Sequence, residues 1–181
     1  MNYTSVAQIL EAIDETRGRL YLTVEDLSAE RQNARPAEDK WSARDVVEHL
    51  SILEDRLVRM MGVMLVKAEA LSAPSTPSTE VPVKMEPFNL DRFIEQARVE
   101  KYVAPEAIRP AGTETISDLL DKMRRSREDL RALRPRIEAT DLSAFTYPHP
   151  VFGPLNFYHW LAFIGIHEER HLRQIKSVLS E

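Results

Sequence analysis

Two histidines one helical turn apart give the clearest chemical signal in this sequence. His167 and His171 lie in the stretch GIHEERHLRQI (165–175), which matches the pattern H-E-x-x-H. In zinc peptidases this pattern supplies two metal ligands, and its glutamate acts as general base. The pair therefore raises two hypotheses: a peptidase site, or a metal site of another kind.

The rest of the chain gives the peptidase hypothesis little support. Such enzymes take a third ligand from further along the chain, but LRQIKSVLSE, which follows His171, has no histidine, and Glu181 is its sole carboxylate. We also expect no substrate-binding strand beside this helix. An H-E-x-x-H metallopeptidase therefore stays the less favoured alternative.

Helical periodicity places both histidines on one apolar face. At about 100° per residue they lie roughly 40° apart on the helix. The face they share also carries Trp160, Ile164, Ile175 and Val178. An unpaired imidazole in a core costs about 1–3 kcal/mol, so the pair needs partners. A divalent metal ion would serve both rings, and hydrogen bonds to neighbouring side chains are the alternative.

A third ligand is available on another predicted helix. His49 lies on the second turn of a helix that begins near Ser42, at the edge of its apolar face. If this helix packs beside the last one, His49, His167 and His171 can form a three-histidine site. Its fourth position would be open to water or substrate, as in catalytic rather than structural sites.

The other residues near the pair have two interpretations each. Glu168 is the candidate catalytic base, but it lies roughly 100° from His167, so it could instead pack at a helix interface or pair with an arginine. Trp41 either plugs the core before its helix or walls a pocket beneath His49. His149 and His159 are expected at the surface or just outside the site.

Four long segments show the helical period that could position these side chains. They are residues 4–27, 42–71, 114–138 and 155–179. Ser42 and Asp45 form a capping-box-like start for the second. The arginines of residues 124–131 interleave with acids and are expected on a solvated face. Joined by loops, the four segments predict an all-α fold, an antiparallel four-helix bundle.

The connections between these segments are polar and rich in proline. Residues 28–41 and 146–156 are predicted to be loops, as is the Pro-rich stretch 73–88, whose role stays open as a lid or as tolerated slack. A short extra helix is predicted over residues 89–102. At this length, 1–181 is expected to form a single domain.

Composition excludes several function classes. The formal net charge is -5, which argues against nucleic acid as the main partner, because phosphate binding favours a basic face. The chain has no cysteine and so no thiolate of its own. There is no signal-peptide pattern and no run of about 18 apolar residues. We therefore expect a cytoplasmic protein that does not enter a membrane.

Three stretches together resemble the DinB-like (DinB/YfiT) superfamily. KWSARDVVEHL (40–50) is similar to its W-S-x-x-[DE]-x-x-x-H-L element, HPVFGPLNFYHWL (149–161) to its entry into the last helix, and HEERHLRQI (167–175) to its H-x3-H-x2-Q-I ending. The order of the three also matches. The middle of the chain carries no such motif.

The resemblance implies a bundle in up-down-down-up order with a metal held by His49, His167 and His171. Nickel, zinc and iron are the ions found in the family, and dimers are frequent. Some relatives transfer groups to low-molecular-weight thiols such as mycothiol or bacillithiol, others are described as metal-dependent hydrolases, and many have no known activity.

A three-histidine ion with an open position supports two chemistries. It can lower the pKa of bound water toward about 7 for hydrolysis of a small molecule. It can also bind and deprotonate the thiol of a cosubstrate, to which a group is then transferred. A metal-binding or stress-related bundle without catalysis is the alternative. The sequence does not identify the substrate.

Overall fold

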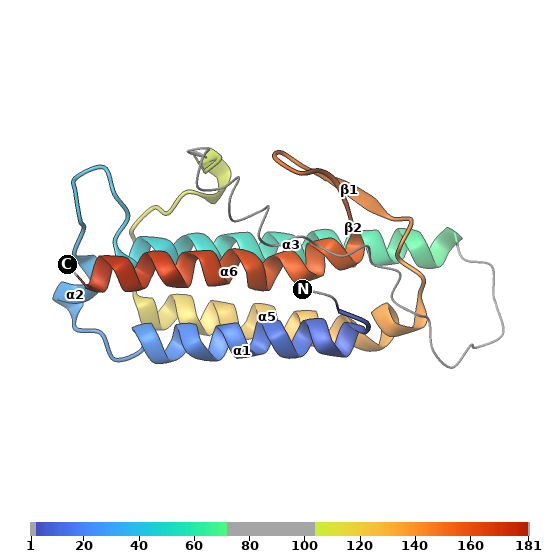
Figure 1. Ribbon diagram of the computed structural model, residues 1–181, viewed down its shortest axis with the longest axis horizontal. Helices are drawn as coiled ribbons and strands as arrows, with labels where there is room; N and C mark the ends of the chain where they lie inside the picture. The colour runs from blue at the N-terminus through green and yellow to red at the C-terminus, as the bar shows by residue number, and fades with distance from the viewer. Residues whose placement is uncertain (1–2, 72–103, 181) are drawn as a thin grey trace.

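The computed structural model describes residues 3–71 and 104–180, and four long helices lie side by side in it (Figure 1). They are α1 (Val6–Val24), α3 (Ala43–Leu71), α5 (Ile116–Ala139) and α6 (Phe157–Leu179). In Figure 1, α1 and α6 run in one direction and α3 and α5 in the other, which is the up-down-down-up order. The most extensive contacts join α3 to α5, α1 to α6, and α3 to α6. The predicted four-helix bundle is confirmed.

Side-chain caps explain where these helices begin. In α3 the cap is reciprocal: the Ser42 amide donates to Asp45 Oδ2 (2.9 Å), and the Asp45 amide donates to Ser42 Oγ (3.2 Å). The capping box predicted for this helix is therefore present. Ser5, Thr115 and Asn156 likewise accept an amide hydrogen at the first turns of α1, α5 and α6.

Two of the predicted loops contain regular structure. Residues 28–41 include a short helix, α2 (Ala29–Asn33), capped by Ser28. Residues 146–156 form an antiparallel hairpin of β1 (Thr146–His149) and β2 (Gly153–Asn156), so the fold is not purely helical. Gly153 has a φ of 70°, the left-handed conformation that a short hairpin loop requires after its turn. The prolines of this stretch therefore indicated a turn, but they did not exclude strands.

The Pro-rich stretch 73–88 and the short helix predicted over residues 89–102 lie outside the described residues. None of the helices described in 3–71 and 104–180 is long and apolar enough to cross a membrane.

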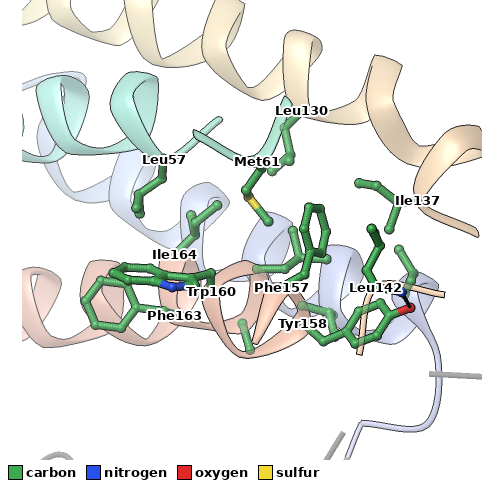
Figure 2. Close-up of a cluster of buried hydrophobic side chains, with 14 of the residues drawn as sticks. Leu57, Met61, Leu130, Ile137, Leu142, Phe157, Tyr158, Trp160, Phe163 and Ile164 are labelled. Atoms are coloured by element: carbon green, nitrogen blue, oxygen red, sulfur yellow. Dashed lines mark hydrogen bonds between the residues drawn. The ribbon is translucent and has the colours of Figure 1, made fainter. Parts of the chain in front are cut away.

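The apolar core is divided into two clusters. The larger one, drawn in part in Figure 2, joins the N-terminal halves of α1 and α6 to the C-terminal halves of α3 and α5, with Met61, Leu130 and Phe157 fully buried. The Tyr158 hydroxyl, at its edge, accepts a hydrogen bond from the Leu142 amide (3.3 Å). The smaller cluster occupies the opposite end of the bundle, around Leu20, Val47, Leu119 and Ile175.

A layer of buried charges separates the two clusters. Each long helix contributes one member where its two apolar stretches meet: Arg17, Glu54, Arg127 and Glu168, here called the ion-pair layer. All four are 4% exposed or less. Arg17 pairs with Glu54 and, through Nε, with Glu168 (2.7 Å), while Arg127 Nε pairs with Glu54 (2.9 Å).

The ion-pair layer corrects one prediction about α5. Residues 124–131 were expected on a solvated face, but Arg127 is only 3% exposed. It also reaches Asp14 on α1 (2.8 Å), whose second oxygen pairs with the exposed Arg131. A charge run identifies a helix face only on average, and one residue of this run turns inward because acids on α1, α3 and α6 pair with it.

Candidate metal centre

Three histidines from two helices meet at the end of the bundle that holds the smaller apolar cluster. His49 projects from the second turn of α3, and His167 and His171 project from successive turns of α6. Ring centroids are 5.2 Å apart for His49 and His167, 4.9 Å for His49 and His171, and 4.4 Å for the α6 pair. One nitrogen from each ring lies within 4.8 Å of the other two. We call these residues the histidine cluster.

Hydrogen bonds on the outer side hold two of the rings with Nε2 turned inward. His49 Nδ1 lies 2.7 Å from the carbonyl oxygen of Ile108, and His171 Nδ1 lies 2.8 Å from Oε1 of Gln174. Both oxygens accept, so each Nδ1 carries a proton and each neutral ring presents a bare Nε2 to the interior. Outer-side bonds of this kind orient histidine ligands in metal sites.

The inner nitrogens of His167 and His171 lie at hydrogen-bond distance, but at most one proton can lie between them. His167 Nε2 lies 3.2 Å from His171 Nε2. Between two such atoms there is room for one shared proton or for one cation, because two lone pairs repel. Nitrogens bound tetrahedrally to one zinc ion at 2.0–2.1 Å are about 3.3 Å apart, so this spacing fits a shared ion.

Burial keeps the histidine cluster neutral near pH 7. Desolvation lowers the pKa of His49, and it lowers that of His171 to about 3, with the charges of His49 and Arg170 adding to the effect there. The pKa of His167 falls well below its usual value for the same two reasons. A metal needs unprotonated imidazole, so these shifts leave the lone pairs available. Three nitrogen donors suit zinc, nickel or iron.

Glu168 follows His167 in the chain, but its carboxylate serves the ion-pair layer. Oε1 accepts from Nε of Arg17 (2.7 Å) and Oε2 from the Nη2 of the same guanidinium (3.1 Å). Burial raises the pKa of Glu168, although the arginines oppose that effect. The geometry favours the arginine pairing that the sequence left open; a catalytic role for Glu168 stays a prediction.

Trp41 covers the histidine cluster from outside the bundle. Its ring lies 5.0 Å from that of His49 and stacks at 6.4 Å on that of His171, measured between centroids. The indole also borders a cavity of about 120 Å³, whose other lining residues are Arg35, Asp45, Pro110, Ala111 and Gly112. The ring therefore packs against the core, as the first interpretation expects. None of the three histidines lines this cavity, so a pocket beneath His49 stays a prediction.

Residues 108–112 border the histidine cluster, although no sequence pattern connected them with it. The Glu48 carboxylate accepts the amides of Ala111 (2.9 Å) and Gly112 (2.8 Å), and this holds the Ile108 carbonyl against His49. Gly112 has a φ of 71°, and a Cβ there would lie 3.2 Å from an Arg44 nitrogen. The burial of Glu48, an acid next to a predicted ligand, points to these residues, but that burial is known only from the structure.

His149 is more enclosed than a surface residue. Its Nδ1 accepts the amides of Val151 (3.1 Å) and Phe152 (3.3 Å) in the hairpin loop, and its ring packs edge-on against Phe163, 5.0 Å between centroids. Phe163 lies 5.3 Å from His167, so His149 is one ring removed from the histidine cluster. Burial lowers its pKa to about 4. His159, partly exposed on α6, lies outside the cluster.

Comparison with known proteins agrees with this architecture. A family model described as the DinB superfamily matches residues 12–175. The uncharacterized protein YuaE of Bacillus subtilis (strain 168) is 30% identical over 173 residues, which cover 93% of this chain and 96% of that protein. The crystal structure of TT2238, a four-helix bundle protein, superposes with a TM-score of 0.61 at 20% identity, over 96% of this chain and 99% of that one.

Proposed function

The chain belongs to the DinB superfamily, and from that premise we propose that it is a metal-dependent enzyme acting on a small molecule. His49, His167 and His171 would hold one divalent transition-metal ion. The reaction would be transfer of a group to a low-molecular-weight thiol or hydrolysis of a small molecule.

One observation carries the proposal: three neutral imidazoles converge in the core, and no other residue of 3–71 and 104–180 donates a hydrogen bond to their inner nitrogens. Two of them are fixed with Nε2 inward by Ile108 and Gln174. A structural histidine pair would be expected to place a proton donor opposite each bare nitrogen. A cation satisfies all three nitrogens at once.

A three-histidine ion keeps an open position, where it makes a bound water or thiol more acidic. The surrounding residues supply the enclosure. Trp41 shields the His49 and His171 rings on one side, and Phe163 covers His167 on another. The chain has no cysteine, so a sulfur nucleophile would have to come from a cosubstrate.

The second candidate is a bundle that binds metal without catalysis. The ion-pair layer and the tight core favour it, since they occupy the bundle interior next to the histidines. In that case the metal would stabilise the fold, yet no thiol or ester substrate would turn over.

The first experiment measures metal content by mass spectrometry on wild type, His49→Ala and His159→Ala, the last as a control histidine outside the cluster. We expect about one transition-metal ion per chain, lost in His49→Ala and kept in His159→Ala. Wild-type protein that binds neither nickel nor zinc when supplied would refute the metal site. Metal kept in His49→Ala would instead support an H-E-x-x-H site confined to α6.

A substrate screen then separates the two candidates. The metal-loaded protein is tested with small thiols as acceptors and with small esters and amides as hydrolysis substrates. Metal-dependent turnover that His49→Ala abolishes supports the enzyme, and its absence with every substrate favours the non-catalytic bundle.

A further inference from the structure

A small cavity of about 10 Å³ lies between the histidine cluster and the ion-pair layer. Its polar lining consists of Arg17, Glu54, His167 and Glu168, and the rest of its wall is leucine and isoleucine. It therefore joins the two buried polar groups of the bundle, which otherwise contact each other only through the chain at residues 167 and 168.

His167 differs from the other two members of its cluster in one respect. His49 and His171 each have an oxygen opposite Nδ1. The Nε2 of His167 faces His171, and its Nδ1 has no hydrogen-bond partner among residues 3–71 and 104–180. To offer Nε2 to a metal, a neutral His167 must carry its proton on Nδ1, and that N–H then needs an acceptor.

The cavity has the size and the partners for one water molecule. About 10–15 Å³ is the least volume that holds a water, and the molecule needs two to four polar partners. The two carboxylates of the ion-pair layer and the His167 ring supply that number. Each carboxylate oxygen already accepts from an arginine but has a second lone pair, so it can accept from water as well.

We propose that one water molecule occupies this cavity, accepts the Nδ1–H of His167, and donates to Glu54 and Glu168. The two glutamates are then positioning residues that set the tautomer of the third imidazole, as Ile108 and Gln174 do for the others. Buried ion pairs add little net stability compared with apolar residues of the same volume. Holding an oriented acceptor beside a metal ligand gives the ion-pair layer a role that apolar residues could not fill.

The effect on metal affinity rests on the proposed function, whereas the water itself does not: without a metal, the proton between His167 and His171 lies on His167 Nε2, and Nδ1 then accepts from the same water. For the first, zinc affinity is measured by chelator competition for wild type, Glu54→Gln and Asp14→Asn. Asp14 is the matched control, because it also pairs with Arg127 but does not line the cavity. Glu54→Gln keeps the size of the side chain and removes its charge.

We expect Glu54→Gln to weaken zinc binding about 10–100-fold, the usual effect of losing an outer partner of a ligand, and Asp14→Asn to leave it unchanged. Equal weakening in both variants would mean that the ion-pair layer acts only through the fold, which overturns the proposal. If Glu54→Gln does not fold, Glu54→Asp keeps the charge while drawing the carboxylate back, and the same contrast with Asp14→Asn applies.

A crystal structure of the metal-free protein tests the water independently. We expect one ordered water within hydrogen-bond distance of His167 Nδ1 and of a Glu54 or Glu168 oxygen. A cavity without water, or a side chain turned into it, overturns the proposal. If the wild type binds neither zinc nor nickel while the water is present, the proposed function is refuted and the water bridge stands.

Discussion

The histidine cluster and the ion-pair layer are both polar, both buried and adjacent on α6, yet they are opposite in one respect. In the ion-pair layer each charged group lies beside an opposite charge; for example, Arg17 Nε is 2.7 Å from Glu168 Oε1. In the histidine cluster neutral bases face one another, with Nε2 of His167 and of His171 3.2 Å apart. The first group is neutralised within the chain, whereas the second groups three nitrogens that could share one cation.

Electrostatics shows the same contrast. Burial alone would lower the pKa of Arg17, but Glu168 and Glu54 together raise it above its usual value. Burial also lowers the pKa of His171, and there the neighbouring His49 lowers it further. Two groups of buried polar residues in one core therefore differ in role. The ion-pair layer links the four helices, whereas the histidine cluster keeps nitrogen lone pairs unprotonated.

The largest expected effect comes from opening the ion-pair layer. Arg17→Ala should lower the free energy of unfolding by about 3–5 kcal/mol, because two buried glutamates are then left with Arg127 alone, which reaches Glu168 only at 3.5 Å. Denaturant unfolding measures it. Arg19→Ala is the control, since its pair with Glu169 is solvent-exposed and should contribute at most about 1 kcal/mol. Similar losses in the two variants would contradict a tightly coupled layer.

Adding metal should stabilise the protein through the histidine cluster alone. At a free zinc concentration 100 times Kd, the gain is about 2.7 kcal/mol, because the folded state alone binds the ion. Melting with zinc and with chelator measures it. His49→Ala should abolish the gain, whereas Arg19→Ala should keep it. A gain that persists in His49→Ala would place the bound ion elsewhere.

Gly165→Ala should affect the ion-pair layer and the histidine cluster differently, because the two regions join different pairs of helices. A Cβ at Gly165 would lie 2.6 Å from Ile13 Cγ2 and 3.4 Å from Ile13 Cα, so it would push α1 away from α6 at a cost of about 1–3 kcal/mol. Arg17 and Glu168 span that interface, whereas the histidine cluster joins α3 to α6. We therefore expect reduced stability with little change in zinc affinity.

The matched control for Gly165→Ala is Gly18→Ala, also within a helix. Nothing lies within 4 Å of a Cβ there, so the variant should be up to about 1 kcal/mol more stable. Equal losses in the two variants would show that close packing of α1 on α6 is not what Gly165 provides.

The smallest effect concerns pH. His149 has a folded pKa of about 4, below that of an unfolded histidine, so the unfolded chain binds the extra proton first. The contribution of His149 to the free energy of unfolding is therefore fully present above about pH 6.5, and it is lost as the pH falls from there toward 4. His149→Asn, which keeps an acceptor for the hairpin amides, should flatten the stability profile of chelated protein in that window. An unchanged slope would mean that His149 does not titrate on unfolding.

Most of the bundle was predictable, because helical periodicity and caps are local. The apolar spacing located all four long helices, and the Ser42–Asp45 cap placed the start of α3 within one residue. The strands β1 and β2 were missed because four-residue strands containing prolines carry no periodic signal. The short helix α2 was also missed, because five residues are too few to show a helical period.

The candidate site was predictable in its residues and not in its surroundings. His167 and His171 share a face at i, i+4 spacing, and His49 was placed on the helix that proves to pack beside theirs. That these three bind metal stays a prediction. The outer partner Ile108 was not foreseen, because a backbone carbonyl from a distant connection leaves no trace in side-chain spacing.

Local sequence patterns were enough to predict which segments are helical, which faces are apolar, and that three histidines could meet. Those properties depend on residues within a few positions of one another. Only the tertiary structure decided that Arg127 turns inward, that Glu168 serves Arg17, and that two imidazoles present Nε2 to a common point. Each of these outcomes depends on which charge or carbonyl another helix or loop brings into reach, and that is set by helix packing rather than by local order.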